Sequence, residues 1–158
     1  MRLFRKTVPN KLEHHFILFM SHLRRIIGID YGSKRIGIAV SDPLRIISQS
    51  VAVFENSPSI IDDIKALIRK YNPEKIVIGN PVTLKGVKGA KAEEVDRFIT
   101  VLERELQIEI VRFDERFTSK IAQQTLRDMG VKKKKRQIKA SIDAMAAALI
   151  LQGYLDQC

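Results

Sequence analysis

The amino-acid sequence predicts an α/β protein with a mixed five-stranded sheet flanked by helices. Two observations lead to this fold class. Three short apolar runs come early and are joined by short connections, which is typical of an antiparallel meander. After them, segments with helical apolar spacing alternate with single apolar runs, and strands joined through one helix are expected to lie parallel. The sheet should therefore contain three antiparallel strands followed by two parallel ones.

The elements can be placed by local signals. β-branched residues predict strands over residues 26–29, 36–40 and 50–54, with Gly32 free to take a positive φ in the first turn. Ser57-Pro58 predicts a helix start, and Asn72-Pro73 predicts its end. The remaining elements are expected at residues 75–79 (strand), 89–106 (helix), 109–113 (strand), 118–130 (helix) and 138–155 (helix).

The chain length of 158 residues suits one domain, and its charge is unevenly distributed. Lys and Arg number 28 against 18 Asp and Glu, for a net charge of +10. Residues 1–25 hold six basic residues and residues 131–140 hold six more, which leaves 16 basic and 17 acidic residues elsewhere. A near-neutral body with two basic segments favours a polyanionic partner.

Composition also restricts the compartment and the domain boundaries. The longest apolar run, residues 144–151, is too short to cross a bilayer, and residues 16–20 are too few for a secretory signal. The single cysteine, Cys158, fits a reducing cytosol, so we expect a cytoplasmic protein without a membrane partner. We expect residues 1–24 to form a flexible extension before a domain at 25–158, with Met20 as an alternative start.

Acidic residues occupy unusual positions. Asp30 ends the first predicted strand, Asp114 and Glu115 end the fifth, and Asp143 is the only charge between residues 140 and 155. If strands one and five lie close together and the last helix packs across them, these carboxylates converge. Such a cluster suits Mg²⁺, and two ions could orient an attacking water and stabilise the leaving oxygen of a phosphodiester.

Each acid has a simpler interpretation. Asp30 could begin the turn, because aspartate favours turns. Asp114 and Glu115 could be an exposed pair beside Arg116, and Asp143 could cap the last helix.

Three motifs resemble one known family. Residues 25–42 closely resemble the opening of the YqgF family, the Holliday-junction resolvases that are also described as pre-16S rRNA nucleases. Residues 114–119 are similar to its second motif, and residues 132–136 followed by 143–147 are similar to its third. The resemblance covers residues 24–154, nearly all of the chain beyond the extension.

The resemblance implies a ribonuclease H-like nuclease domain at residues 25–158. It implies a hydrolase that uses Mg²⁺, with Mn²⁺ as an alternative, held by Asp30, Asp143 and either Glu115 or Asp114. Because adjacent strand residues face opposite ways, only one of the last two should point into the site. The implied activity is trimming the 5′ end of precursor 16S rRNA in the bacterial cytoplasm, with a Holliday junction as the alternative substrate.

Basic residues near these motifs are expected to contact nucleic-acid phosphates, which adds salt-sensitive affinity without sequence preference. They are Lys34, Arg35, Arg116, Lys132, Lys133, Lys134, Lys135 and Arg136. A solvated loop is the alternative for the lysine run, and Arg116 could instead pair with Asp114.

Two other functions remain open. Asp30-Tyr31-Gly32 also matches the phosphate hairpin of actin-like and sugar-kinase phosphotransferases, although these use two such domains. A non-catalytic RNA-binding module is the second, and it would not require the acids. The choice between RNA and DNA and the oligomeric state are not determined by the sequence.

Overall fold

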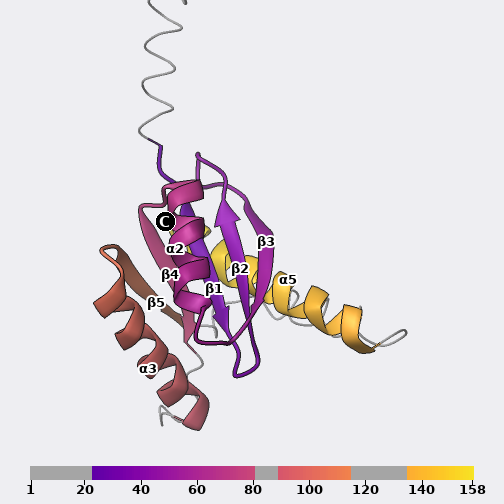
Figure 1. The fold of residues 1–158 in the computed structure, drawn as a ribbon. Helices are drawn as coiled ribbons and strands as arrows, with labels where there is room; N and C mark the ends of the chain where they lie inside the picture. Colours follow the sequence, from indigo (N-terminus) through magenta and orange to yellow (C-terminus); the bar gives the residue numbers. More distant parts are fainter. Residues whose placement is uncertain (1–22, 81–88, 115–134) are drawn as a thin grey trace, which may run out of the picture.

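The structure is a computed structural model that describes residues 23–80, 89–114 and 135–158; of residues 135–144 it describes the helical backbone only. Its elements in chain order, labelled as in Figure 1, are β1 (Ile26–Tyr31), β2 (Arg35–Ser41), β3 (Ser48–Glu55), α2 (Ile60–Tyr71), β4 (Lys75–Asn80), α3 (Ala90–Glu105), β5 (Glu109–Asp114) and α5 (Lys135–Leu155). The helix predicted over residues 118–130 lies outside the described residues.

The sheet has the strand order β3-β2-β1-β4-β5. β1 pairs antiparallel with β2, and β2 pairs antiparallel with β3. β1 pairs parallel with β4, and β4 pairs parallel with β5. The predicted mixed sheet is therefore confirmed, and β1 lies at its centre.

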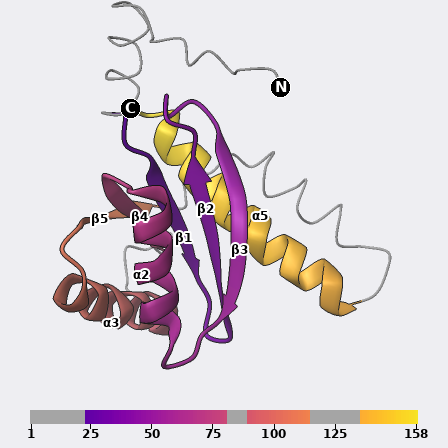
Figure 2. The same cartoon turned by 45° about the horizontal axis from the view of Figure 1, so that its top comes forward.

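Helices cover both faces of the sheet (Figure 2). α2 and α3 lie on one side, here called the α2/α3 face, and α5 crosses the opposite side, here called the α5 face. The larger core fills the α2/α3 face, where Ile27 and Ile29 of β1 pack with Ile64 of α2 and Ile99 of α3. The smaller core lies under α5. Its buried members are Ile26, Ala39, Val77, Phe113, Ala147, Ile150, Leu151 and Leu155. Burial on both faces explains why β1 and β4 are continuous apolar runs rather than alternating ones.

Two helix starts differ from the sequence prediction. Helix α2 begins at Ile60 with Ser59 as its N-cap, rather than after Ser57, because the carbonyl of Ser57 accepts a turn hydrogen bond from the N–H of Ile60. Helix α5 begins at Lys135, three residues earlier than predicted. Lysine and arginine are good helix formers, so Lys135 and Arg136 can begin this helix.

The predicted end of α2 is confirmed. Asn72 adopts the left-handed conformation with φ 45°, and its N–H donates to the carbonyl of Ile68. Pro73 follows, so the chain leaves the helix there. Among the described residues, no helix combines the length and the apolar character that crossing a membrane requires.

Helix α5 lies very close to the sheet at Gly28 in β1. A Cβ atom on Gly28 would lie 2.6 Å from the Cβ atom of Leu151 and 3.2 Å from the carbonyl oxygen of Ala147. Both atoms belong to the helix framework of α5, so neither can rotate away. Only glycine therefore lets α5 lie this close to β1.

We predict that Gly28→Ala destabilises the protein by about 1–3 kcal/mol, because the added methyl group pushes α5 away from β1. Denaturant unfolding measures the change. The sign of the effect is decisive, since Gly→Ala at a strand position with free space stabilises by about 0.4–1 kcal/mol. A more stable variant would show that the helix does not approach β1 as described.

Candidate active site

The carboxyl ends of β1, β4 and β5 lie at the same end of the sheet, and two predicted site residues are found there. In the parallel registers Ile29 lies beside Ile78, and Asn80 lies beside Asp114. Asp30 therefore lies near the end of β1, level with the last residues of β4. With β4 between them, β1 and β5 are about 10 Å apart.

Asp30 belongs to the α5 face of the sheet. The ring of Tyr31 packs against that of Phe98 of α3 in a tilted arrangement with centroids 4.8 Å apart, and Ile29 lies in the core beneath α2 and α3. Because successive strand residues point to opposite faces, Asp30 between them points to the α5 face, as Gly28 does. Asp30 is half-buried and pairs across the sheet with Gly37 of β2, so it is part of a strand rather than of a turn.

Asp114 belongs to the other face. Phe113 packs edge-on against Tyr154 of α5, whereas Arg112 forms an ion pair with Asp96 of α3. Alternation therefore places Asp114 with Arg112 on the α2/α3 face. The structure thus brings Asp30 and Asp114 to the same end of the sheet but directs them to opposite faces.

Asn80 is a residue of this end that the sequence analysis did not single out. It lies beside Asp114 in the register, and its Oδ1 atom is buried with no hydrogen-bond partner among the described residues. A buried amide oxygen of this kind costs about 1–3 kcal/mol unless a donor reaches it. The only sequence signal was its position at the end of an apolar strand.

Of the four predicted acids, one is described only as a backbone position and one is not described. Glu115 lies outside the described residues. Asp143 is described only as a backbone position in α5, eight residues after the helix begins, so it does not cap that helix. It precedes Ala147 by one turn, and Ala147 and Leu151 lie against Gly28. Within the described residues, no group of three or more His, Cys, Asp or Glu is arranged to hold a metal ion.

The β1–β2 hairpin that follows Asp30 is held from the side by Asn56. The Nδ2 of Asn56 donates to the carbonyl of Gly32 over 3.0 Å, and its backbone N–H donates to the carbonyl of Lys34, also over 3.0 Å. A Cβ atom on Gly32 would lie 2.5 Å from the carbonyl oxygen of Arg35, so this turn requires glycine. Asn56 therefore fixes the turn that follows Asp30, and no local sequence signal indicated this.

The predicted phosphate contacts are only partly described. Lys34 is exposed at the hairpin tip, and Arg35 is half-buried opposite Glu55 of β3. Arg116 and Lys132, Lys133 and Lys134 lie outside the described residues, and Lys135 and Arg136 are described as backbone positions at the start of α5.

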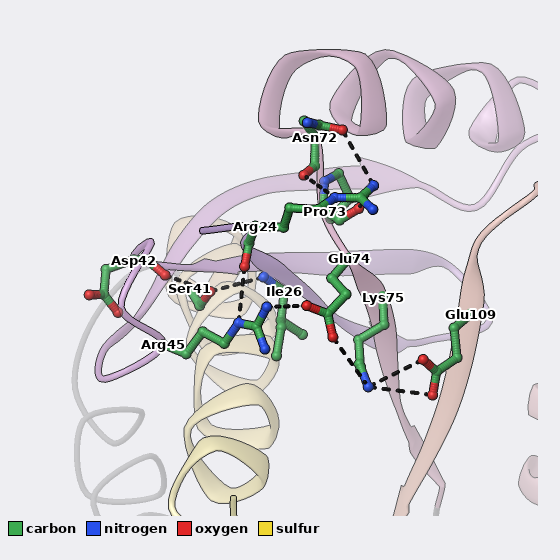
Figure 3. Close-up of polar contacts among 10 residues, drawn as sticks. All are labelled: Arg24, Ile26, Ser41, Asp42, Arg45, Asn72, Pro73, Glu74, Lys75 and Glu109. Atoms are coloured by element: carbon green, nitrogen blue, oxygen red, sulfur yellow. Dashed lines mark hydrogen bonds and ion pairs between the residues drawn. The ribbon is translucent and has the colours of Figure 1, made fainter. Parts of the chain in front are cut away.

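A different kind of polar cluster lies at the end of the sheet where β1, β4 and β5 begin (Figure 3). Arg45 donates to the carbonyl of Arg24 over 3.0 Å and forms an ion pair with Glu74. Lys75 lies 3.2 Å from Glu109 and 3.7 Å from Glu74. The hydrogen bond that Lys75 donates to Glu109, together with the charges of Glu109 and Glu74, raises the pKa of Lys75. Here carboxylates and cations neutralise one another, so this cluster joins loops and strand starts and does not form a cation site.

Several known proteins are similar to this chain. A family model described as "RuvX: Holliday junction resolvase" matches residues 24–157. A protein of Ruminiclostridium cellulolyticum is 38% identical over 136 residues, which is 84% of this chain and 94% of that protein. A protein of Sulfurihydrogenibium sp. is 42% identical over 137 residues, which is 85% of this chain and 92% of that protein. Both are described as candidate pre-16S rRNA nucleases.

One solved structure supports the fold. The structure described as Thermus thermophilus RuvC in complex with a Holliday junction substrate matches with a TM-score of 0.50 at 14% identity. The match covers 85% of this chain and 96% of that one. The ribonuclease H-like fold implied by the sequence motifs is therefore confirmed.

We predict that Asn56→Ala loosens the hairpin that follows Asp30. Loss of one hydrogen bond of about 1 kcal/mol should speed amide hydrogen exchange at residues 32–35 about fivefold. Ser57→Ala is the matched control, because the Ser57 hydroxyl contacts Ser59 and not the hairpin. Equal exchange rates in the two variants would contradict the role given to Asn56.

Proposed function

The chain belongs to the RuvX family of Holliday junction resolvases, and we propose that it is a metal-dependent nuclease that processes the 5′ end of precursor 16S rRNA in the bacterial cytoplasm. A nuclease of this kind is a hydrolase acting on phosphodiester bonds. The observation that carries the proposal is the position of Asp30, which lies at the carboxyl end of the central strand on the face covered by α5.

We assign the role of second carboxylate to Glu115 rather than to Asp114. Arg112 contacts α3, Phe113 contacts α5, and Asp114 follows on the α3 side. If the strand pattern continues for one residue, Glu115 falls on the same face of the sheet as Asp30. This alternation supports the choice that the sequence alone left open.

The third carboxylate in the proposal is Asp143. It shares a helical stripe with Ala147 and Leu151, since these residues are spaced four apart. The latter two lie against Gly28, which is two residues before Asp30 and on the same face of β1. This spacing supports Asp143 as the third carboxylate.

A divalent cation suits this donor set, because carboxylate oxygens are the ligands that Mg²⁺ and Mn²⁺ prefer. Asp30, Glu115 and Asp143 would hold it. When bound, the cation would activate water and stabilise charge on the phosphodiester oxygens. The chain's own contribution is to fix these carboxylates: β1 and its hairpin hold Asp30, while the close packing of α5 on Gly28 determines how near Asp143 lies.

Nucleic-acid binding is assigned to the basic residues that the sequence indicated. Lys34 is exposed at the tip of the hairpin that follows Asp30. The proposed phosphate contacts also include Arg35, Arg116, Lys132, Lys133, Lys134, Lys135 and Arg136. Backbone contacts of this type position a substrate without reading its sequence.

Precursor rRNA is preferred as the substrate because two relatives about 40% identical to this chain are described as candidate nucleases for it. A Holliday junction is the second candidate, since the matched family is described by that activity. Both substrates are branched or folded polyanions that a protein can recognise through shape and phosphates.

We predict that Asp30→Asn, Glu115→Gln and Asp143→Asn each lower the cleavage rate at least about 100-fold, since each removes a charge that holds the cation. Asp114→Asn should retain most activity. The assay compares precursor 16S rRNA with a synthetic junction, in Mg²⁺ and in chelator.

Circular dichroism of each variant controls for folding. Full activity of folded Asp30→Asn would contradict the nuclease assignment, whereas a loss in Asp114→Asn with full activity in Glu115→Gln would reverse the choice of carboxylate. Faster cleavage of the junction than of the RNA would favour the second substrate.

We predict that neutralising the five basic residues at positions 132–136 to Gln weakens binding and lowers the slope of log affinity against log salt by about 2 to 4. The matched control is Arg69→Gln with Lys70→Gln, two exposed cations at the far end of α2. Filter binding over a salt series measures both slopes. An unchanged slope in the first variant would show that the run is only a solvated segment.

A further inference from the structure

The loop between β2 and β3 carries an exposed apolar cluster. Leu44, Ile46 and Ile47 are 56%, 62% and 64% exposed, and they are the exposed large hydrophobic residues of the described part of the chain. Single exposed apolar side chains are ordinary on protein surfaces, but a contiguous group indicates a contact surface. We call these three residues the apolar loop.

The backbone of the apolar loop is held by Asp42. One carboxylate oxygen of Asp42 accepts from the N–H of Ile46 over 2.7 Å and of Ile47 over 2.9 Å, and the other accepts from Leu44 over 3.2 Å. Burial alone would raise the pKa of Asp42, but these backbone donors hold it below its usual value. The carboxylate therefore keeps its charge, and its acceptor strength, at a lower pH than an ordinary aspartate.

Arg45 in the middle of the loop has a strained backbone. Its φ is 61°, a conformation that residues other than glycine rarely adopt. The guanidinium is fixed by the carbonyl of Arg24 and by Glu74, and the side-chain amide of Gln152 in α5 donates to the carbonyl of Ile46 over 3.0 Å. The fold thus tolerates strain while it holds the apolar side chains outward.

The beginning of the described chain lies at the base of this loop. The carbonyl of Arg24 accepts the hydrogen bond from Arg45, so the segment that precedes Arg24 joins the domain there. That segment contains the apolar run 16–20, Phe-Ile-Leu-Phe-Met, which has no charge. An extended chain spans about 3.3–3.6 Å per residue, so the four residues from Met20 to Arg24 can reach about 14 Å. The run can therefore contact the loop without any change in the domain.

We infer that the apolar loop is a docking site for the chain's own N-terminal segment, with residues 16–20 covering Leu44, Ile46 and Ile47. The family match begins at residue 24, so the segment is an addition to the shared domain. The inference does not depend on the proposed nuclease activity, because the loop lies at the amino end of β1 and Asp30 lies at the other end.

A tethered segment fits this surface better than a second copy of the chain. A stable dimer buries about 800 Å² on each partner, which is more than three side chains of one loop supply. A short tether, in contrast, raises the local concentration of the apolar run to the millimolar range, so a small contact area is sufficient.

The first test measures the accessibility of the loop. In a Cys158→Ser background, Ile46→Cys is labelled with a maleimide in the full chain and in a chain that starts at Met20. We expect the full chain to react on the order of tenfold more slowly at every protein concentration. Lys34→Cys, exposed at the opposite end of the sheet, is the matched control and should react equally in both lengths.

Further labelling measurements identify what covers the apolar loop. Replacing Phe16, Ile17, Leu18 and Phe19 of the full chain with Ser should restore fast labelling. Equal rates in the two chain lengths, or protection that survives these replacements, would overturn the inference. Protection that grows with protein concentration in both lengths would instead identify a second copy as the occupant and would also overturn it.

The second test is a double-mutant cycle in which the melting temperature, Tm, is measured. Removing residues 1–19 should lower Tm by about 2–4 °C when the loop is native. The same truncation should have little effect when Leu44, Ile46 and Ile47 are all Ser, because the two changes then remove the same contact. Equal shifts in both backgrounds would show that the segment and the loop do not interact.

Discussion

Parallel pairing of β1 with β4 and of β4 with β5 is the constraint on which the rest of the molecule depends. Parallel neighbours cannot be joined by a tight turn, so α2 and α3 are needed as crossovers, and they cover one face of the sheet. The same pairing brings three strand ends together. Asp30 and Asp114 lie at one end of the sheet, and the ion pairs around Glu74 and Lys75 lie at the other end.

The two faces of the sheet differ, because one contains the larger core and the other carries Asp30. The α2/α3 face contains the larger core, and Tyr31 and Phe98 extend that core to the end of β1. The α5 face is crossed by one helix whose distance from β1 is set by the missing side chain of Gly28. Asp30 lies on this second face. Its surroundings therefore depend on the position of α5, and a change at Gly28 would alter the site as well as the stability.

Much of the fold could be predicted because its signals are local. Apolar runs marked every strand, and Asn72-Pro73 marked the end of α2. Where the prediction failed, competing contacts decided the outcome. Ser57 closes a turn with Ile60 and leaves the N-cap position to Ser59, and Lys135 and Arg136, which precede the predicted helix start, begin α5.

The site was less predictable, because it depends on register and on contacts between distant residues. The sequence alone could not say on which face of the sheet Asp114 lies, but the contacts of Arg112 with α3 and of Phe113 with α5 assign a face to each position of β5 up to Asp114. The bond from Asn56 to Gly32 joins residues 24 positions apart. The left-handed backbone of Arg45 likewise has no local signal, since it depends on Arg24 and Glu74.

The central claim is that three carboxylates meet on the face of the sheet that α5 covers. A crystal of the full chain soaked in Mn²⁺ tests it most directly, because anomalous scattering locates the ion without an activity assay. We predict an ion about 2 Å from carboxylate oxygens of Asp30, Glu115 and Asp143, and not bound to Asp114. An ion bound to Asp114 on the opposite face, or carboxylates of Asp30 and Asp143 too far apart to share one ion, would contradict it.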